Sequence, residues 1–555
     1  MGLVCTLPWL LVLAAGPFFS DYQRRYRLAA SSTGLQEAAA DPPVADPAQD
    51  LSEASTDYTQ THSLSFRAMS TTTHFPDADC FQRQSDEFVS WLSQKPGVRI
   101  NPNIQVTDLR SQGAGRGVVA RSDIADGEEL FAIPRDVVLT VQNSGLKNRI
   151  SQDLDELGPW LSLIVVMIHE YLLGEKSVWA HYFRVLPTKF DTLMFWTDSE
   201  LSELQASAIV DKIGKQDAEQ SILDMVVPIV RANPHLFPPV EGLSSYDGEE
   251  GARVLLELAH RMGSLIMAYA FDIEKSEDEE GDGEDGYVTD DEDQLPKGMV
   301  PLADLLNADG DRNNARLFQE EKFLVMRAIK PIKAGDELFN DYGEIPRADL
   351  LRRYGYVTDN YAQYDVVELP LALICQAAGL SDAEPENQPP LKLLEDLEIL
   401  EDGYCIPRPS SEEPLADLLP DELLALLKTL TLTPDQLKQL KSKNKAPKPA
   451  FTLPEAQLLM EVVQKRATQY STSIEQDEEI LSRFHEMEVS GPLEGSPRRQ
   501  KMAVQVRLGE KEILRQLSAM LSDYISNAKQ NGEGGPSAKR NAPDGDSRKA
   551  KIQKT

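Results

Sequence analysis

The chain reads Pro301-Leu-Ala-Asp-Leu-Leu-Asn-Ala308 and, further along, Gly335-Asp-Glu-Leu-Phe-Asn-Asp-Tyr-Gly343. A glycine-rich segment, Gly113-Ala-Gly-Arg-Gly117, precedes both, and Tyr354-Gly-Tyr-Val357 follows them. Alone, Asn307 is compatible with a helix cap and Tyr342 with a half-buried core aromatic. Four such segments in this order favour one shared site, because independent patterns then agree.

The glycine-rich segment does not match a dinucleotide-binding fingerprint. Val118 occupies the position of the third glycine, and no long helix follows to direct its N-terminus at a pyrophosphate. It is also a poor first motif for a Rossmann-type methyltransferase, because Arg110, Ser111 and Gln112 intervene between the possible acidic residue Asp108 and the glycines. Taken alone, the segment is equally compatible with a flexible turn between two strands.

The patterns around these segments indicate an α+β fold. A short helix is expected at 82–96, followed by an antiparallel meander of strands at 104–109, 117–120, 129–133 and 137–141. Residues 158–273 predict helices, at 158–173 (apolar on nearly every side), 200–213, 216–231 and 252–271. Strand patterns return at 315–318, 323–329 and 337–340. Strands, a helical insertion and strands again differ from the regular alternation of a doubly wound sheet.

After Pro370 the sequence predicts a second, all-helical domain over residues 371–527. Thr433, Thr452 and Ser473 are each followed three residues later by Gln or Glu, which is the capping-box pattern of a helix start. One apolar stripe indicates that the last helix packs against a core. Its members are Ile513, Leu514, Leu517, Leu521, Tyr524 and Ile525.

Composition limits the possible partners. The 555 residues include 56 Lys and Arg against 90 Asp and Glu, a net charge of −34. Such a surface disfavours binding along nucleic acid or an anionic membrane and attracts a basic partner. The 4 cysteines include no CxxC pair, which argues against a disulfide scaffold and a cysteine zinc cluster.

Three segments are expected to lie outside the packed domains. Residues 1–68 read as an extension; the apolar run 3–19 is similar to a signal-peptide core but has no Lys or Arg before it. Residues 274–293 contain 12 Asp or Glu and one Lys, typical of a solvated insert, or alternatively of a lure for a basic substrate. From Asn531 the chain is basic, which fits a bipartite nuclear-import signal or simply a soluble tail.

Together the segments resemble the SET-domain protein lysine methyltransferases, in the subclass of the Rubisco large-subunit methyltransferases, and most of all the fungal ribosomal lysine methyltransferases. The resemblance extends over about residues 85–527 and includes Trp179–Pro187, Met194–Trp196, Ala268–Phe271, Tyr470–Asp477 and Arg507–Leu514. It implies a SET fold of short antiparallel strands at 81–365, with a helical insertion at about 145–295. An all-α substrate-binding domain would occupy 366–528, with disordered flanks at 1–80 and 529–555.

The resemblance also implies roles for individual residues. Tyr342 would be the catalytic tyrosine. S-adenosylmethionine would be held by Ala114, Gly115, Arg116, Tyr269, Asn307, Ala308 and Tyr354. Trp160 and Phe271 would line a lysine channel, or alternatively belong to the core. The family usually has Asn-His where this chain has Asn307-Ala308. No metal is expected.

The implied function is S-adenosylmethionine-dependent methylation of a lysine in a large-subunit ribosomal protein. Two alternatives stay open: methylation of a histone or another nuclear protein, and a non-catalytic module that binds lysine peptides. The expected partner is a basic protein, with no direct nucleic-acid or membrane binding. A monomer in the nucleus, with the cytoplasm as a second compartment, is expected.

Overall fold

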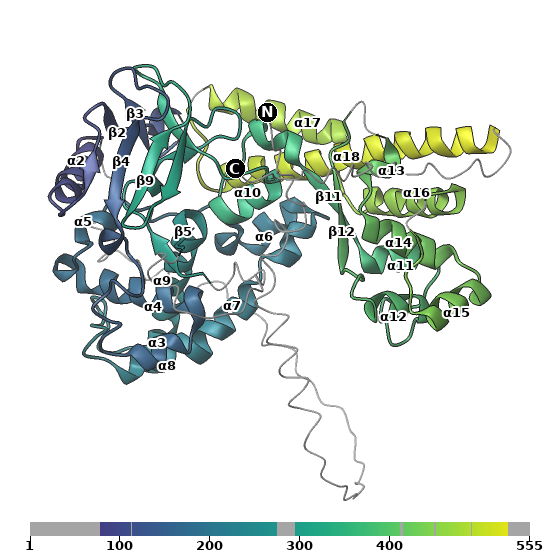
Figure 1. The fold of residues 1–555 in the computed structure, drawn as a ribbon, viewed down its shortest axis with the longest axis horizontal. Coiled ribbons are helices and arrows are strands. Elements are labelled where there is room, and N and C mark those ends of the chain that lie inside the picture. The colour runs from purple at the N-terminus through teal and green to yellow at the C-terminus, as the bar shows by residue number, and fades with distance from the viewer. Residues whose placement is uncertain are drawn as a thin grey trace, which may run out of the picture.

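The computed structural model describes residues 78–112, 114–274, 295–410, 414–448, 451–489 and 491–530. Strands and helices of the first two thirds of the chain form one part of the molecule, and the helices that follow form a second part beside it (Figure 1). The expected extension before residue 78, nearly all of the acidic insert and the basic tail from Asn531 lie outside the described residues. No helix within the described ranges is long and apolar enough to span a bilayer.

Two four-stranded sheets form the β part. One has the order β1-β4-β9-β8, from Arg99–Ile100, Glu129–Pro134, Phe323–Ala328 and Ala315–Gln319. The other has the order β2-β3-β10-β7, from Ile104–Asp108, Arg116–Ala120, Glu337–Asn340 and Asn307–Ala308. Buried and half-buried side chains alternate along the first residues of β2, because successive side chains of a strand point to opposite faces of the sheet.

The strand predictions need three corrections. The expected strands at 104–133 do not form one meander, because β4 pairs with β9 in the other sheet. Residues 137–141 form no strand; a 3₁₀ turn, Arg135–Val137, is followed by a single bridge between Leu139 and Met299. β7 and β10 pair in parallel, a long-range contact that local alternation cannot specify.

The helical insertion begins after the first strands. Its helices are α3 Ser151–Asp155, α4 Gly158–Leu173, α5 Ala180–Phe183, α6 Asp198–Leu201, α7 Lys215–Ser221, α8 Val227–Ala232 and α9 Gly248–Tyr269. α4 packs against α9, and its middle is buried as the all-round apolar pattern predicts. α7 and α8 are joined by one π-helical segment, Ile222–Val226, so the expected helix at 216–231 is nearly continuous.

Two predicted helices of the insertion end differently from expectation. The run 200–213 breaks at Gln205, which has a φ of 54°. Its amide exchanges hydrogen bonds with Thr472 and the Ser471 amide of the second part, so a distant contact overrides helix propensity. α9 stops at Tyr269, because the chain turns into β5, Ala270–Asp272, which pairs with β6, Lys297–Met299.

The first helix and the last helix both extend beyond their expected limits. α2 spans Ala78–Ser93, so residues 78–80, expected in the extension, are helical. α18 spans Gly495–Gln530 and therefore includes Lys529 and Gln530, which were expected in the tail. Helix ends are the least certain feature of a periodic pattern, since the pattern itself is carried by the apolar residues further inside.

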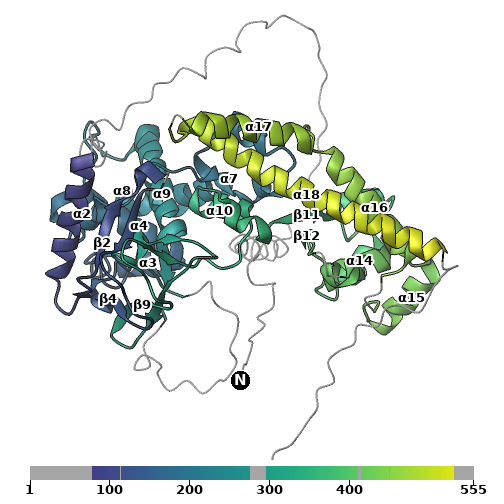
Figure 2. The same cartoon turned by 90° about the horizontal axis from the view of Figure 1, so that it is seen from above.

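The second part contains α11 Leu371–Ala377, α12 Pro389–Glu395, α13 Leu415–Leu418, α14 Asp421–Thr431, α15 Pro434–Lys443, α16 Leu453–Thr468, α17 Ile474–Glu488 and α18. The three predicted capping boxes are confirmed. Ile513, Leu514, Leu517 and Leu521 of the predicted stripe are fully buried in its core. α17 and α18 run side by side and reach back to the first part (Figures 1 and 2).

The all-α expectation for this part needs one correction. β11, Val366–Pro370, pairs in antiparallel register with β12, Gly403–Pro407. Each strand alternates half-buried and buried side chains, with Val367, Leu369, Tyr404 and Ile406 facing the core. These apolar residues at a spacing of two, mostly β-branched or aromatic, are a strand pattern, though each run is only five residues long.

Candidate active site

The parallel pairing of β7 with β10 brings two of the motifs together. Asn307 lies opposite Phe339, and Ala308 lies opposite Asn340. β3, which begins at Arg116, pairs with the other edge of β10. Three segments separated by long stretches of sequence therefore meet in one sheet, and Tyr342 follows two residues after β10. The prediction that these motifs share a site is consistent with this arrangement.

The Asn307 side chain is fixed by two acceptors. Its Nδ2 donates to Glu337 Oε1 at 2.7 Å and to the Arg116 carbonyl oxygen at 3.3 Å. Both amide hydrogens are thus directed into the sheet. Burial raises the pKa of Glu337, while the hydrogen bond from Asn307 lowers it. Asn307 therefore ties β7 to β3 and β10.

Gly115 and Gly117 have different surroundings. A Cβ at Gly117 would collide with Leu109 and lie 2.6 Å from Glu337 Oε1, so any larger residue there would force these side chains to shift. A Cβ at Gly115 would meet nothing within 4 Å. The backbone beside Gly115 is open and can be approached closely by a ligand.

Aromatic rings surround Tyr342. Its ring stacks on Tyr354 with centroids 4.0 Å apart and an interplanar angle of 3°. Tyr354, the last residue of α10 (Arg347–Tyr354), lies next to Tyr356 at 6.4 Å. Both pack with Tyr361 of the 3₁₀ segment Asp359–Tyr364. We call Tyr342, Tyr354, Tyr356 and Tyr361 the tyrosine cluster.

The tyrosine cluster keeps its phenols protonated. Burial, followed by the neighbouring Tyr356 and Tyr354 hydroxyls, raises the pKa of Tyr342 well above its ordinary value. Burial likewise raises the pKa of Tyr354, Tyr356 and Tyr361. These groups act at neutral pH as hydrogen-bond donors and polarised aromatic surfaces, not as bases.

One hydroxyl of the cluster has no protein partner. Tyr361 is 1 % exposed, and its Oη makes no hydrogen bond within the described residues. A buried, unpaired hydroxyl is costly, so such an atom commonly marks a place for a ligand or water. Tyr356 and Tyr361 were not among the predicted site residues; the Tyr354-Gly-Tyr356 spacing is the one local signal that pointed to either of them.

Asp304 is a buried carboxyl group close to Tyr269. Burial raises the pKa of Asp304 to about 7, although a hydrogen bond from the Tyr182 hydroxyl lowers it. Burial, then the Asp304 charge, raises the pKa of Tyr269 to about 12. Asp304 belongs to the 3₁₀ turn Ala303–Leu305 just before β7, where Leu302 has a φ of 79°. The Tyr182 contact anchors this turn to the helical insertion.

The side chain and the backbone of Arg116 face different neighbours. Its guanidinium is buried against α2, donating to Ser85 Oγ at 3.0 Å and to the Val185 carbonyl at 3.0 Å, and it covers the Phe81 ring. The side chain therefore connects β3 to α2 and the insertion, and its backbone is what faces Asn307. Ala114 closes the preceding turn by donating to the Leu109 carbonyl at 3.3 Å.

The two residues expected in a lysine channel, Trp160 and Phe271, belong to α4 and β5. Trp160 is half-buried on α4 and packs against the core, and half-buried Phe271 is in β5, two residues after Tyr269. Their role in a lysine channel stays a prediction. Within the described ranges no three His, Cys, Asp or Glu side chains are grouped to hold a metal ion.

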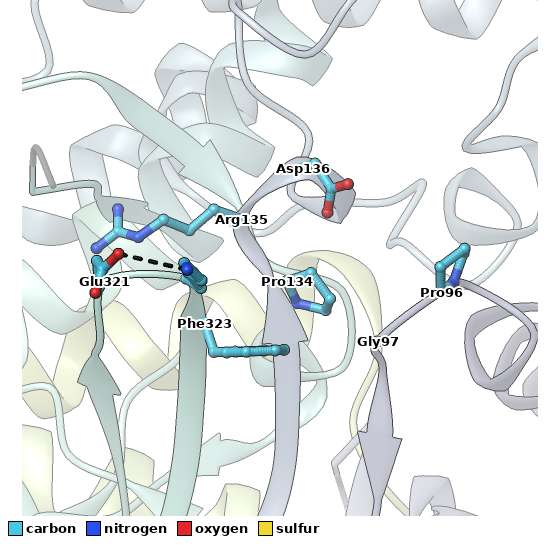
Figure 3. Close-up of a pocket in the computed structure, with 8 residues that line it drawn as sticks. Pro96, Gly97, Pro134, Arg135, Asp136, Glu321 and Phe323 are labelled. Carbon is cyan, nitrogen blue, oxygen red and sulfur yellow. Dashed lines mark ion pairs between the residues drawn. The ribbon is translucent and has the colours of Figure 1, made fainter. Parts of the chain in front are cut away.

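A separate hollow lies on the other sheet. It has a volume of about 520 Å³ and is lined by Pro96, Gly97, Pro134, Arg135, Asp136, Glu321, Lys322 and Phe323 (Figure 3). An ion pair of 3.7 Å joins Glu321 and Lys322 across its rim. It contains none of the predicted site residues, and it is largely open to solvent.

The tyrosine cluster is suited to a cationic group. Stacked phenol faces attract cations, and the hydroxyls of the cluster supply polar contacts. An amine brought into such an apolar space loses its proton more readily, because burial disfavours the charged form. The site can therefore align a neutral amine with an electrophile.

Two family models match the chain. The SET domain model matches residues 115–343, and the Rubisco LSMT substrate-binding model matches residues 388–514. The first contains β3, β7, β10 and Tyr342, and the second contains much of the helical part.

Curated relatives have lysine methyltransferase names. Ribosomal lysine N-methyltransferase 4 of Saccharomyces cerevisiae is 34% identical over 54% of this chain, which spans 60% of that relative's length. N-lysine methyltransferase SETD6 of Bos taurus is 30% identical over 78% of this chain and 93% of its own length.

A solved structure shares the fold. The structure described as the SET domain of LSMT bound to lysine and AdoHcy has a TM-score of 0.57 at 22% identity, covering 81% of this chain and 93% of that one. The α+β expectation is confirmed by this likeness and by the two matched models. The chain belongs to the SET-domain N-lysine methyltransferases that carry a Rubisco LSMT substrate-binding domain.

Proposed function

We propose that this protein transfers a methyl group from S-adenosylmethionine to a lysine of a large-subunit ribosomal protein, in the tyrosine cluster. The observation that carries the proposal is the pairing of β7 with β10, which brings the Asn307-Ala308 segment next to the strand that leads into the Tyr342–Tyr354 stack. The family to which the chain belongs supplies the reaction class, and the site supplies residues suited to it.

The residues present fit S-adenosylmethionine. The open backbone at Gly115 gives room for close approach, and the Asn307 side chain is held in place by the two hydrogen bonds that its Nδ2 donates. The unpaired Tyr361 hydroxyl and the phenol faces suit a cationic ligand. Ala114, Gly115, Asn307, Ala308, Tyr269 and Tyr354 would hold the cofactor, with Arg116 contributing through its backbone. Bound there, it supplies an electrophilic methyl group.

Tyr342 has the central role in the proposed mechanism. Its protonated hydroxyl orients the amine nitrogen, and the apolar rings around it favour the neutral amine. Alignment of the nitrogen with the methyl carbon accounts for most of the rate in such a displacement, which needs little acid-base catalysis. The proton of the amine leaves to solvent before transfer, so no buried base is required.

The substrate assignment rests on two observations. The yeast relative is named as a ribosomal lysine methyltransferase, and the net charge of −34 favours a basic partner. Histones are equally basic, so they remain the second candidate. The nucleus, where both kinds of protein occur, is the proposed compartment; a fluorescent fusion excluded from the nucleus would contradict that assignment.

Substrate identity is tested with labelled methyl donor. Ribosomes and histones are prepared from cells that lack this protein and incubated with radiolabelled S-adenosylmethionine and the purified wild-type chain. A labelled band in the large ribosomal subunit that is absent with Tyr342→Phe supports the proposal.

Two other results have different meanings. Label confined to histones would move the substrate while preserving the reaction. Tight cofactor binding without label in any fraction would favour the lysine-binding module, and Ala308→His would then test whether the missing family histidine restores transfer.

A further inference from the structure

The long helix α18 of the substrate-binding domain packs against α10 and contacts the segment that carries Tyr361. Gln505, Gly509 and Glu512 are spaced by four and three residues, so they share one face of α18. Gln505 Nε2 donates to Asp359 Oδ1 at 3.2 Å, and Glu512 accepts from Arg408 at 2.8 Å. We call this the junction face of α18.

Asp365 is the centre of the contact with that face. It is 4 % exposed, and its Oδ2 accepts from Arg347 Nη2 at 2.6 Å and from Arg408 Nη2 at 3.1 Å. Its Oδ1 accepts from the backbone amide of Arg347 at 3.1 Å. Pro346, at the start of α10, makes no side-chain cap, so Asp365 caps this helix from a distant position.

Gly509 permits the approach of α18. A Cβ there would collide with Asp365 Oδ2 and contact the Arg347 guanidinium. Just before Gly509 along the helix, Met502 and Val506 pack against Leu351 of α10. α18 thus rests on α10 through a close glycine contact at one point and an apolar contact at another.

Both segments held by Asp365 lead into the tyrosine cluster. α10 is only eight residues long, starts at Arg347 and ends at Tyr354, which stacks on Tyr342. The segment Asp359–Tyr364, which carries Tyr361, ends immediately before Asp365. A shift of the Asp365 carboxylate therefore moves the beginning of one helix and the end of the other segment.

We propose that Asp365 is a positioning residue that couples the docking of α18 to the placement of Tyr354 against Tyr342. The coupling rests on the proposed function, because Tyr354 is assigned there to the cofactor. The substrate-binding domain thereby contributes to cofactor binding through the Gly509–Asp365–Arg347 contact, without touching the cofactor.

Gly509→Ala in the full-length chain tests the coupling, with Gly263→Ala as its matched control. Both remove a glycine from a long helix, but the control Cβ would meet only Ile164 Cδ1 at an ordinary 3.5 Å. We expect Gly509→Ala to weaken S-adenosylmethionine binding, measured by calorimetry well below the melting temperature, by about tenfold. The control should stay within about twofold of wild type. Asp365→Asn, which keeps the volume and removes the charge, should follow Gly509→Ala.

A double-mutant cycle separates positioning from simple destabilisation. In a Tyr354→Ala background, Gly509→Ala should cause a clearly smaller loss of affinity, because the part of its effect that passes through Tyr354 is already gone. Equal losses in both backgrounds, or a lower melting temperature with unchanged affinity, would overturn the coupling.

The proposed function fails by a different result, namely a wild-type chain that does not bind S-adenosylmethionine. In that case near-ultraviolet circular dichroism of the tyrosines still tests the junction without ligand. A spectrum altered by Gly509→Ala and not by Gly263→Ala supports the coupling, and unaltered spectra contradict it.

Discussion

Gly115 and Gly117 stand two positions apart, yet one faces open space and the other faces Leu109 and Glu337. Gly117→Ala should lower the free energy of unfolding by about 1–3 kcal/mol, because a methyl group has no room there. Gly115→Ala should leave unfolding nearly unchanged and weaken S-adenosylmethionine binding. Urea denaturation and calorimetry measure the two effects. Equal stability losses in both variants would contradict this account.

The buried Asp304 predicts a dependence of stability on pH. Burial raises its pKa from 3.8 to about 7, so the folded protein holds this proton more tightly than the unfolded chain does. The resulting stabilisation is complete below about pH 4 and is lost as the pH rises through about 7. Asp304→Asn cannot ionise, so its unfolding free energy should fall less between pH 4 and 8. An unchanged pH slope would show that Asp304 does not cause the effect.

Individual site residues were predictable from the sequence where they lie in a motif. They were not predictable where their role depends on packing against distant segments. Asn307 and Tyr342 could be singled out because each lies in an ordered set of motifs. The burial of the Arg116 guanidinium under α2 could not, since Ser85 and Val185 are far from it in sequence. The unpaired Tyr361 hydroxyl is likewise visible only once α10 and the following segment are placed.

At the scale of single elements, the start of α17 tests whether a capping box read from the sequence stabilises its helix. Ser473 accepts from the Gln476 amide at 3.2 Å, and the Gln476 side chain accepts from the Ser473 amide at 2.8 Å. Ser473→Ala should cost about 1 kcal/mol of unfolding free energy. Ser482→Ala, exposed on the same helix, is the control and should change stability by less than about 0.5 kcal/mol. Chemical denaturation measures both changes in unfolding free energy. Equal losses in Ser473→Ala and Ser482→Ala would show that the Ser473 cap does not stabilise the helix.

Local patterns predicted helices better than strands. The capping boxes and the buried α4 follow from residues near one another in sequence. The partners of strands β4 and β7 do not, because strand pairing depends on distant segments. The small sheet of β11 and β12 was not predicted for the same reason, because α11 and α12 separate its two strands in the sequence.

Over the whole molecule, the two parts are joined by buried charge on α18. Arg507 is 1 % exposed and donates to Asp477 of α17 at 2.9 Å and to Glu203 of the insertion at 3.0 Å. Arg507→Met should cost about 3 kcal/mol, because Asp477 and Glu203 then lose their shared partner. Arg515→Met, exposed on the same helix, should change little. Thermal unfolding of Arg507→Met measures this effect. If the two parts unfold in separate transitions and only one transition is destabilised, Arg507 does not stabilise both parts.

The order of strands, helical insertion, strands and helices was enough to predict the α+β architecture and its two parts. The contact between them was not predictable, since it depends on single residues such as Gln205 and Gly509 that carry no local signal. The motifs are separate segments of the sequence. In the structure they meet in one sheet and one cluster of tyrosines.

The most direct test of that cluster as a methyl-transfer site compares the wild-type chain with Tyr342→Phe. Calorimetry with S-adenosylmethionine is paired with single-turnover transfer to ribosomal protein. We predict an affinity within about threefold of wild type and a transfer rate lower by about a hundredfold, because the variant keeps the ring stack and loses the orienting hydroxyl. Transfer by Tyr342→Phe at the wild-type rate, or no cofactor binding by the wild-type chain, would contradict the account.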